Sequence, residues 1–240
     1  MSEIVNESYI GSAIVYMDGR DCGNVSDVNF AIEQDTKTQP NYRGGGGLFD
    51  EQALIKSVKF KATFLNFNNE NLALALRGKV EVLTEGEITA PESITAVLDG
   101  LADTAFMIDT AVAAVVTNAA GTTTYVVDVD YVVSAGGIRA LSSGTITEGE
   151  ALKVTYTKKA GSALQALTES GKTVKLTIDG INDATGKPWV IKVHKWKPTP
   201  TSGLSVIGTD YGSFDIEGGV LADTSIVATG KSKFFVRSAA

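Results

Sequence analysis

The chain has 240 residues, of which 43% are hydrophobic and 20% charged, and its formal net charge is −7 at pH 7. This length and apolar content allow a sizeable core, which excludes wholesale disorder. The acidic balance argues against a protein that grips nucleic acid. The 25 glycines and 5 prolines, together with many Val, Thr and Ile residues, predict a mainly β fold of strands joined by tight turns.

Cysteine and histidine each occur once, as Cys22 and His194. A single cysteine excludes an internal disulfide, and the pair of counts excludes the usual zinc ligand sets and a Cys-His dyad. We therefore predict no catalytic, cofactor-binding or metal-binding residues, and a protein that is not an enzyme. The N-terminus lacks a basic region followed by an apolar run, and the longest apolar run, 111–116, is far too short to span a membrane. We expect a soluble chain made in a cytoplasm, with no membrane partner.

The first third of the chain reads as strands around one irregular segment. Strands are predicted over 12–17 and 25–32, the second from the period-two spacing of Val28, Phe30 and Ile32. Residues 33–49 keep no apolar period and include four consecutive glycines, Gly44, Gly45, Gly46 and Gly47. This composition predicts a long mobile loop, a feature that in compact proteins is usually functional or disordered.

A strand and a short helix follow this segment. Residues 57–67 alternate apolar and polar side chains, the pattern of a half-buried strand. A helix is predicted over 69–77, with Asn69 as N-cap and Gly78 at the C′ position. Its Leu72 and Leu76 are expected to pack on the sheet, and a strand resumes at 79–83.

The composition changes over residues 84–162, which hold ten acidic residues and four basic ones. Short apolar runs separated by turn signals predict a small Ig-like β-sandwich of its own, inserted into the first domain. The flanking segments, 1–83 and 163–240, are then the two parts of one split β domain. Within the insert, Asp128 and Asp130 are expected on one solvated strand face.

The last segment, 163–240, again shows the strand pattern of the residues before the insert. Strands are predicted over 172–178, ending in a turn at Asp179-Gly180, and over 189–196, with further pieces at 214–216, 220–221 and 233–237.

Several stretches, in this order, resemble the major tail tube protein of long-tailed, siphovirus-type bacteriophages. They are GSAIVYMDG, VSDVNFAIEQ with the Gly-rich segment after it, KSVKFKATFLNFNNENLALALRGKV, the insert's TTYVVDVDYVVSAGG and GEALKVTYTKK, TIDGINDATGKPWVIKVHKWKPTP, and GSFDIEGGVLAD. The resemblance covers most of the chain. The shared order of these motifs carries the likeness.

The resemblance implies a tail-tube β-sandwich or barrel domain with one short helix, interrupted by the insert as an outward decoration. It implies a structural virion protein that self-assembles in the bacterial host cytoplasm into stacked hexameric rings, forming the hollow phage tail through which viral DNA passes without specific binding. Other tail proteins (tape measure, terminator and distal tail) are implied partners. The 33–49 loop is then the inter-ring stacking loop, through Tyr42, Arg43, Gly44, Gly45, Gly46, Gly47, Leu48 and Phe49.

An alternative from another class is an Ig-like adhesion or carbohydrate-binding β module. An adhesin requires an export route, and a sugar site usually requires exposed aromatic rings beside carboxylates. Trp189 and Trp196 lie in a Lys-rich predicted strand and read more simply as core or interface residues.

Overall fold

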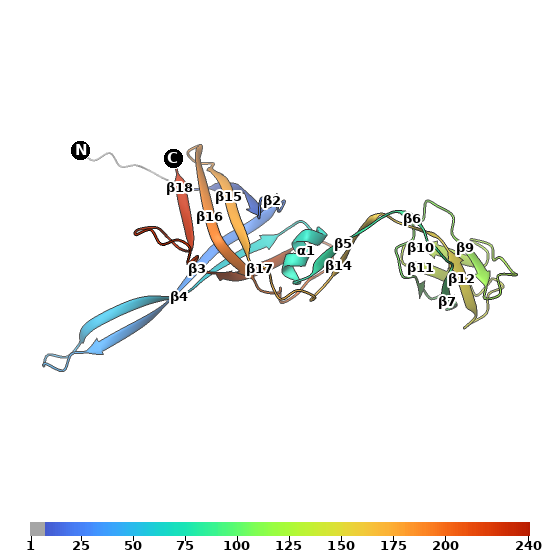
Figure 1. The fold of residues 1–240 in the computed structure, drawn as a ribbon, viewed down its shortest axis with the longest axis horizontal. Coiled ribbons are helices and arrows are strands. Elements are labelled where there is room, and N and C mark those ends of the chain that lie inside the picture. The colour runs from blue at the N-terminus through green and yellow to red at the C-terminus, as the bar shows by residue number, and fades with distance from the viewer. Residues whose placement is uncertain (1–7) are drawn as a thin grey trace. The chain divides into compact units, whose positions relative to one another are not determined.

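The computed structural model describes residues 8–240 and is mainly β, with one short helix in that range (Figure 1). The elements in chain order are β1 (Gly11–Met17), β2 (Arg20–Asp21), β3 (Val25–Pro40), β4 (Leu48–Phe64), α1 (Asn69–Ala75), β5 (Lys79–Leu83), β6 (Gly86–Glu87), β7 (Glu92–Thr95), β8 (Ala102–Asp103), β9 (Val115–Asn118), β10 (Tyr131–Ser134), β11 (Gly137–Ala140), β12 (Ala151–Thr155), β13 (Thr157–Lys158), β14 (Gly161–Gln165), β15 (Val174–Asn182), β16 (Lys187–Pro198), β17 (Phe214–Val220) and β18 (Phe235–Ala239).

The chain divides into two compact units. Unit 1 combines the N-terminal part up to Val80 with Leu164–Ala240, and unit 2 is Glu81–Ala163. The expected insert, 84–162, lies inside unit 2, and residues 1–7 of the expected first domain part lie outside the described residues. The two connecting segments are themselves strands, since β5 pairs with β14 and β6 with β13.

Unit 1 is built on one antiparallel sheet with the strand order β2-β1-β15-β16-β17-β4-β3, and β18 also pairs with β16. Alternation along β17 and along residues 58–64 of β4 sends every second side chain inward, as the sequence predicted for this part of β4. The sheet curls around a core, which brings together side chains of strands that do not pair with each other. Phe60 of β4 meets Trp196 of β16 at 5.2 Å between ring centroids, and Phe30 of β3 stacks on Phe235 of β18 at 4.8 Å.

The N-cap of α1 lies one residue earlier than predicted, and the helix ends at Ala75, two residues before the predicted end. Asn68, and not Asn69, is the N-cap, because its side chain accepts a hydrogen bond from the Asn71 backbone N–H at 2.8 Å. Arg77, and not Gly78, adopts the left-handed conformation after the helix, with φ of 46°. The Gly78 N–H donates to the Ala73 carbonyl at 2.8 Å, which closes a Schellman motif.

The predicted packing face of α1 is only partly reproduced. Leu72 is half-buried and packs against the core cluster that contains Phe60, together with Leu74. Leu76 is the C-cap residue and is half-buried. The fully buried positions of the helix are instead Asn71 and Ala75. Asn71 can be buried at low cost because its side-chain amide is hydrogen-bonded: it donates to the Cys22 carbonyl at 2.8 Å, and its Oδ1 accepts from Arg20 at 2.7 Å.

Position 78 requires glycine because neighbouring atoms leave no room for a side chain, and not because of its φ angle. A Cβ at this position would lie 2.6 Å from the Gln165 carbonyl oxygen and 2.7 Å from Leu164 Cδ1. We therefore expect Gly78→Ala to lower the free energy of unfolding of unit 1 by about 1–3 kcal/mol, the usual cost of overpacking. The matched control is Gly219→Ala in β17, where an added Cβ meets nothing within 4 Å. Thermal unfolding followed by circular dichroism measures both, and equal midpoints would contradict the packing argument.

The turn predicted at Asp179-Gly180 is wrong, because both residues lie inside β15. Gly180 pairs with Trp189 of β16, and a Cβ on it would lie 2.4 Å from the Trp189 ring. The glycine therefore makes room for an indole within the sheet, a role that Asp-Gly composition does not reveal. The actual turn follows Asn182, whose carbonyl accepts from the Thr185 and Gly186 N–H groups.

The long mobile loop predicted over 33–49 is also wrong. Glu33–Pro40 belongs to β3 and Leu48–Phe49 to β4, and only residues 41–47 connect them. The strands continue as a long two-stranded ribbon beyond the body of unit 1 (Figure 1). The apolar period is missing because neither face of this ribbon is buried, so main-chain pairing defines the strands without a hydrophobic alternation.

Unit 2 is a small β-sandwich. One three-stranded sheet has the order β10-β11-β8 and the other β7-β12-β9. Inward side chains of both sheets form a single core cluster that includes Ile138, Leu152 and Val154. Its tyrosines are also satisfied: Tyr131 donates to the Ala114 carbonyl at 2.9 Å, and Tyr156 to Glu92 at 2.7 Å.

Asp130 is a structural acceptor, and the prediction that it shares a solvated strand face with Asp128 is wrong. It is buried just before β10 and accepts hydrogen bonds from the Val126 and Thr145 N–H groups and the Thr145 hydroxyl, each at 2.8 Å. These bonds lower the pKa of Asp130 below its ordinary value. Asp128 lies in the turn before it, with φ of 62°.

Candidate assembly surfaces

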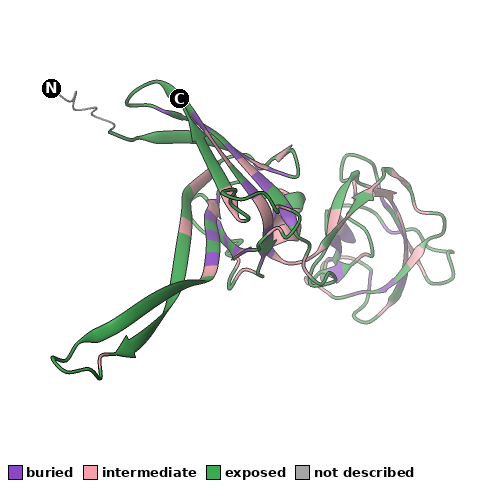
Figure 2. Cartoon of the chain, turned by 60° about the vertical axis from the view of Figure 1, so that its left-hand side comes forward, coloured by how far each residue is buried: buried purple, intermediate pink, exposed green. Residues whose placement is uncertain are grey.

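The distal part of the β3–β4 hairpin is the most unusual surface of unit 1. We call residues 32–57 the arm; it comprises the outer halves of both strands and the connection between them. No arm residue is buried, and Figure 2 shows the ribbon exposed along both faces. An isolated two-stranded ribbon is marginally stable in water. An arm of this length is therefore expected to be covered by another surface.

The two faces of the arm differ in chemistry. Cross-strand partners point to the same face, and the pairs Gln34–Ile55 and Thr36–Ala53 continue the face of Ile32. Ile32 and Ile55 are 54% and 57% exposed, so this face displays apolar side chains to water. Glu51, the partner of Thr38, lies on it as a charged exception. We call this face the apolar face.

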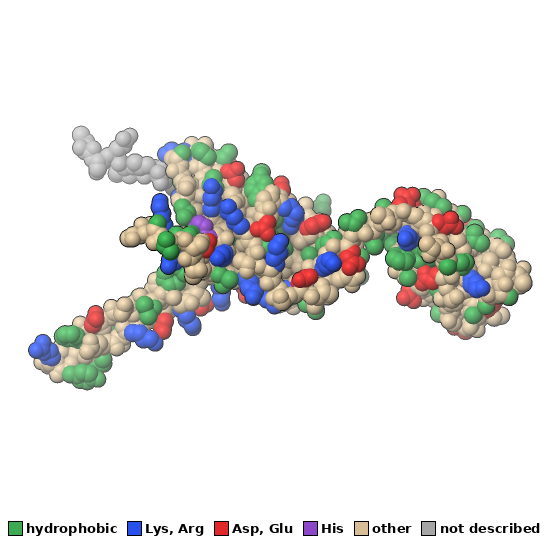
Figure 3. Space-filling view, in the orientation of Figure 1, with side chains coloured by type: hydrophobic (Ala, Val, Ile, Leu, Met, Phe, Trp, Pro, Cys, Tyr) green, Lys and Arg blue, Asp and Glu red, His purple; other side chains and the backbone are tan. Residues whose placement is uncertain are grey.

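The opposite face of the arm is charged. It carries Glu33, Asp35, Lys37 and Asp50, with Leu54 as its apolar exception. The Lys37 ammonium lies 2.9 Å from the Asp35 carboxylate. The arm is thus amphipathic, the pattern of a segment that lies on a partner with one side and faces water with the other. Figure 3 shows hydrophobic side chains along the arm and at its end, beside basic ones.

The tip of the arm, residues 40–49, is a defined turn. The Asn41 side-chain amide donates to the Gly44 and Gly46 carbonyls, and its Oδ1 accepts from the Arg43 N–H at 2.9 Å. All four glycines of the tip have positive φ, between 70° and 96°, a conformation that other residues rarely adopt. The glycines therefore shape the turn, and sequence reasoning missed Asn41 as the residue that holds it.

The structure brings the sequence-predicted side chains together at this tip. Tyr42 is 87% exposed, and Leu48 and Phe49 are also exposed. No side-chain partner of Arg43 occurs among the described residues. An aromatic, aliphatic and arginine mixture is typical of protein–protein interfaces.

A second candidate surface is the outward face of the unit 1 sheet, which we call the polar face. Its charged residues include Lys59 and Lys61 on β4, Asp215 and Glu217 on β17, and Lys192 and Lys197 on β16. Lys61 lies 2.6 Å from Asp215, and Lys59 lies 3.3 Å from Glu33. The hydrogen bond with Lys61 lowers the pKa of Asp215, and that with Asp215 raises the pKa of Lys61. Both groups therefore stay ionised and pair within the sheet at neutral pH.

Open sheet edges form a third candidate surface. In residues 8–240, the end strands β2 and β3 each have one pairing partner, and β18 pairs only with β16. An unpaired strand edge presents rows of N–H and C=O groups that can bond to another chain. Unit 1 therefore offers edges from which a sheet can continue into a neighbour.

Metal-binding groups, membrane-crossing helices and exposed aromatic rings are the other features that could indicate a function. No group of three or more His, Cys, Asp and Glu side chains in residues 8–240 is placed to hold a metal ion. Among these residues, no helix is long and apolar enough to cross a membrane. In unit 2 the aromatic residues are Tyr125, Tyr131, Tyr156 and Phe106; the tyrosines are buried, and the Lys158 ammonium lies 5.0 Å from the centre of the Phe106 ring.

Comparison with known proteins identifies a family and no characterised relative. No curated protein matches the chain at a significant level. One family model matches residues 8–238, which is nearly all of the sequence and includes both units. The chain therefore belongs to the family described as "Protein of unknown function UCP028589".

Proposed function

We propose that this protein is the tail tube protein of a long-tailed bacteriophage, which self-assembles into stacked hexameric rings around a lumen for viral DNA. The observation that carries the proposal is the arm, an exposed amphipathic ribbon whose tip gathers Tyr42, Arg43, Leu48 and Phe49. A subunit that functions alone has no physical reason to keep such a surface exposed. The resemblance in motif order supplies the identity of the assembly.

The sheet of unit 1 supports the same proposal. Closing a ring through the open edges would pair main-chain groups that a single subunit leaves exposed. The polar face would then line the lumen. Its β4 lysines are paired with carboxylates, Lys61 with Asp215 and Lys59 with Glu33, which weakens their pull on the counterions of passing DNA.

The role of unit 2 in this proposal is an outward decoration. Its core cluster shares no residue with that of unit 1, so its fold does not depend on tube residues.

An adhesion or carbohydrate-binding module is the second candidate. Stacking on a sugar needs an exposed aromatic face. The tyrosines of unit 2 are buried, and the Phe106 ring, which is 43% exposed, has the Lys158 ammonium over it at 5.0 Å from its centre. This arrangement disfavours a sugar site there.

Negative-stain electron microscopy of the purified chain tests the proposal. We expect rings with a central hole, stacked into hollow tubes at higher concentration. Discrete monomers at all concentrations, combined with retention on a glycan array, would favour the second candidate instead.

The same microscopy on a chain with residues 84–162 replaced by a Gly-Ser linker should still show tubes, because the linker only has to close a loop.

A further inference from the structure

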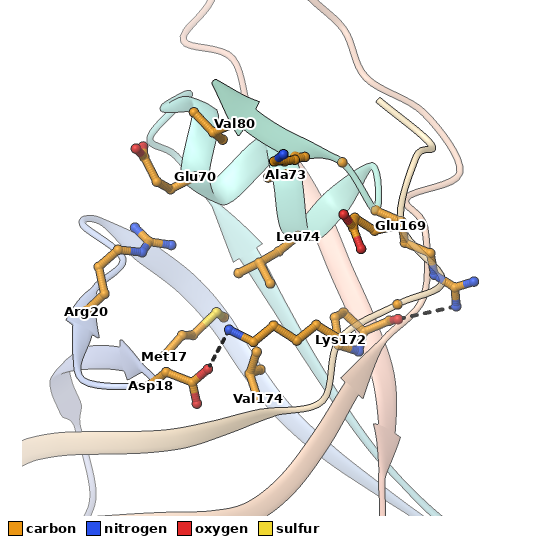
Figure 4. Close-up of a pocket in the computed structure, with 15 residues that line it drawn as sticks. Met17, Asp18, Arg20, Glu70, Ala73, Leu74, Val80, Glu169, Lys172 and Val174 are labelled. Atoms are coloured by element: carbon orange, nitrogen blue, oxygen red, sulfur yellow. Dashed lines mark hydrogen bonds and ion pairs between the residues drawn. The ribbon is translucent and has the colours of Figure 1, made fainter. Parts of the chain in front are cut away.

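A cavity of about 550 Å³ opens in unit 1 beside α1, over an apolar floor that includes Met17 and Val174 (Figure 4). Basic and acidic side chains line it together, and Lys172 pairs with Asp18 at 3.4 Å. Because its charges are mixed, this cavity selects no ligand by charge.

A second cavity, of about 350 Å³, lies at the end of the unit 1 sheet and has a different lining. It forms where the turn between β15 and β16 comes beside the end of β18 (Figure 1). Trp189 of β16 pairs there with Ala239 of β18, and the Ala240 N–H donates to the Pro188 carbonyl at 3.2 Å. We call it the end cavity; paired main chain of β16 and β18 frames it.

The register of β16 and β18 places two cations on the core face of the sheet at this end. Residues two apart along a strand share a face, and so do cross-strand partners. Lys187 therefore shares the face of the buried Trp189, and Arg237, the partner of Ile191, lies on the same face. Both basic side chains line the end cavity, whereas no Asp or Glu side chain among residues 8–240 does so.

Neither cation is neutralised by a contact. Within residues 8–240, the Lys187 ammonium and the Arg237 guanidinium make no hydrogen bond and no ion pair. Asp183 is close to Lys187 in sequence, but its carboxylate accepts from the Ser12 hydroxyl at 3.0 Å. The carboxylate at the end of the chain, on Ala240, belongs to the lining and forms an ion pair with neither cation.

Trp189 adds a buried donor that lacks an acceptor. It lines the end cavity, is 7% exposed and packs over Gly180. Its indole Nε1–H is buried and has no hydrogen-bond partner among the described residues. Buried donors are nearly always paired in folded proteins, so an unpaired one in a residue that lines a cavity points to an acceptor supplied from outside the chain.

We propose that the end cavity binds a small oxyanion, of phosphate or carboxylate chemistry, through the Arg237 guanidinium and the Lys187 ammonium. A guanidinium donates two parallel hydrogen bonds to the oxygens of either group, and an ammonium adds a compact positive charge. The volume is at the lower end of the range for small-ligand sites. The end cavity shares no residue with the arm, so the proposal goes beyond the proposed function and does not rest on it.

Isothermal titration calorimetry of the full-length chain tests the proposal with inorganic phosphate and with succinate, at an ionic strength held constant with sodium chloride. At least one of the two anions should bind with a Kd of about 1 mM or lower, and the comparison identifies the preferred chemistry. Lys187→Gln combined with Arg237→Gln should weaken binding by about tenfold or more, because charge-assisted hydrogen bonds are lost. Both side chains are exposed, so this variant should keep the wild-type thermal midpoint. Lys192→Gln with Lys231→Gln removes the same charge at exposed positions outside the end cavity and should bind like the wild type.

Tryptophan fluorescence locates the bound anion. Trp189 lines the end cavity, whereas Trp196 is fully buried outside its lining. The anion should therefore change the emission of the wild-type chain and leave that of Trp189→Phe unchanged. Failure of both anions to bind, equal binding by the Lys187 and Arg237 variant, or a response that persists in Trp189→Phe would each overturn the proposal. One subunit contains every residue of the lining, so these results do not depend on whether the chain forms tubes.

Discussion

A chain whose arm is cut back to its base should fold normally and form no tubes. The variant removes Asp35–Leu54 and joins Gln34 to Ile55 through Asn-Gly. Gln34 and Ile55 are cross-strand partners, so a two-residue type I′ turn fits between them without a change of register. Because no removed residue is buried, we expect a thermal midpoint within a few degrees of wild type. Tube growth should be lost completely, as measured by negative-stain microscopy and sedimentation.

The control for the arm deletion is a larger deletion elsewhere in the chain. Replacing residues 84–162 with a short linker removes far more of the chain, and yet tubes should persist, since the decoration contributes nothing to the proposed stacking. Long tubes from the arm deletion would show that stacking uses another surface. A large drop in its thermal midpoint would show instead that the arm stabilises the single subunit.

Much of unit 1 could be predicted from local patterns because one face of its central strands is buried. The alternation of Val58, Phe60, Ala62 and Phe64 defined both the strand and its inward face, and all four are buried. The helix was also predictable, because its caps are local. Its exact ends were not, since the capping roles passed to Asn68 and Arg77 through hydrogen bonds that neighbouring candidates could equally have made.

The arm could not be predicted as a hairpin because its order comes from pairing and not from burial. An apolar period in a sequence indicates a buried face, and no residue in 33–56 is buried. The four glycines were interpreted as mobility, whereas their positive φ values form the turn that Asn41 holds. The candidate residues at the tip could be named from the sequence because an aromatic and arginine mixture is recognisable without its backbone. The structure shows Tyr42, Leu48 and Phe49 exposed, and their part in stacking stays a prediction. The cavity beside α1 in unit 1 could not be predicted from the sequence, because Met17, Leu74 and Val174, which line it, are brought together only by the tertiary fold.

The two core clusters provide the second large expected effect. Phe60 is fully buried and contacts the rings of both Phe30 and Trp196 at 5.2 Å between centroids. We expect Phe60→Ala to cost unit 1 about 3–5 kcal/mol, from lost burial and the cavity that remains. At roughly 2–4 °C per kcal/mol for a unit of this size, its transition should fall by about 10 °C.

Unit 2 should not respond to Phe60→Ala, because its cluster around Leu152 and Val154 shares no residue with that of unit 1. Leu152→Ala is the reciprocal variant, and it should lower the unit 2 transition by about 2–5 kcal/mol and leave that of unit 1 in place. Differential scanning calorimetry of the full chain resolves the two transitions when either one is displaced. If both variants shift a single common transition, the two cores unfold as one cooperative unit, and unit 2 is then part of the structural body of the subunit and not a separable decoration.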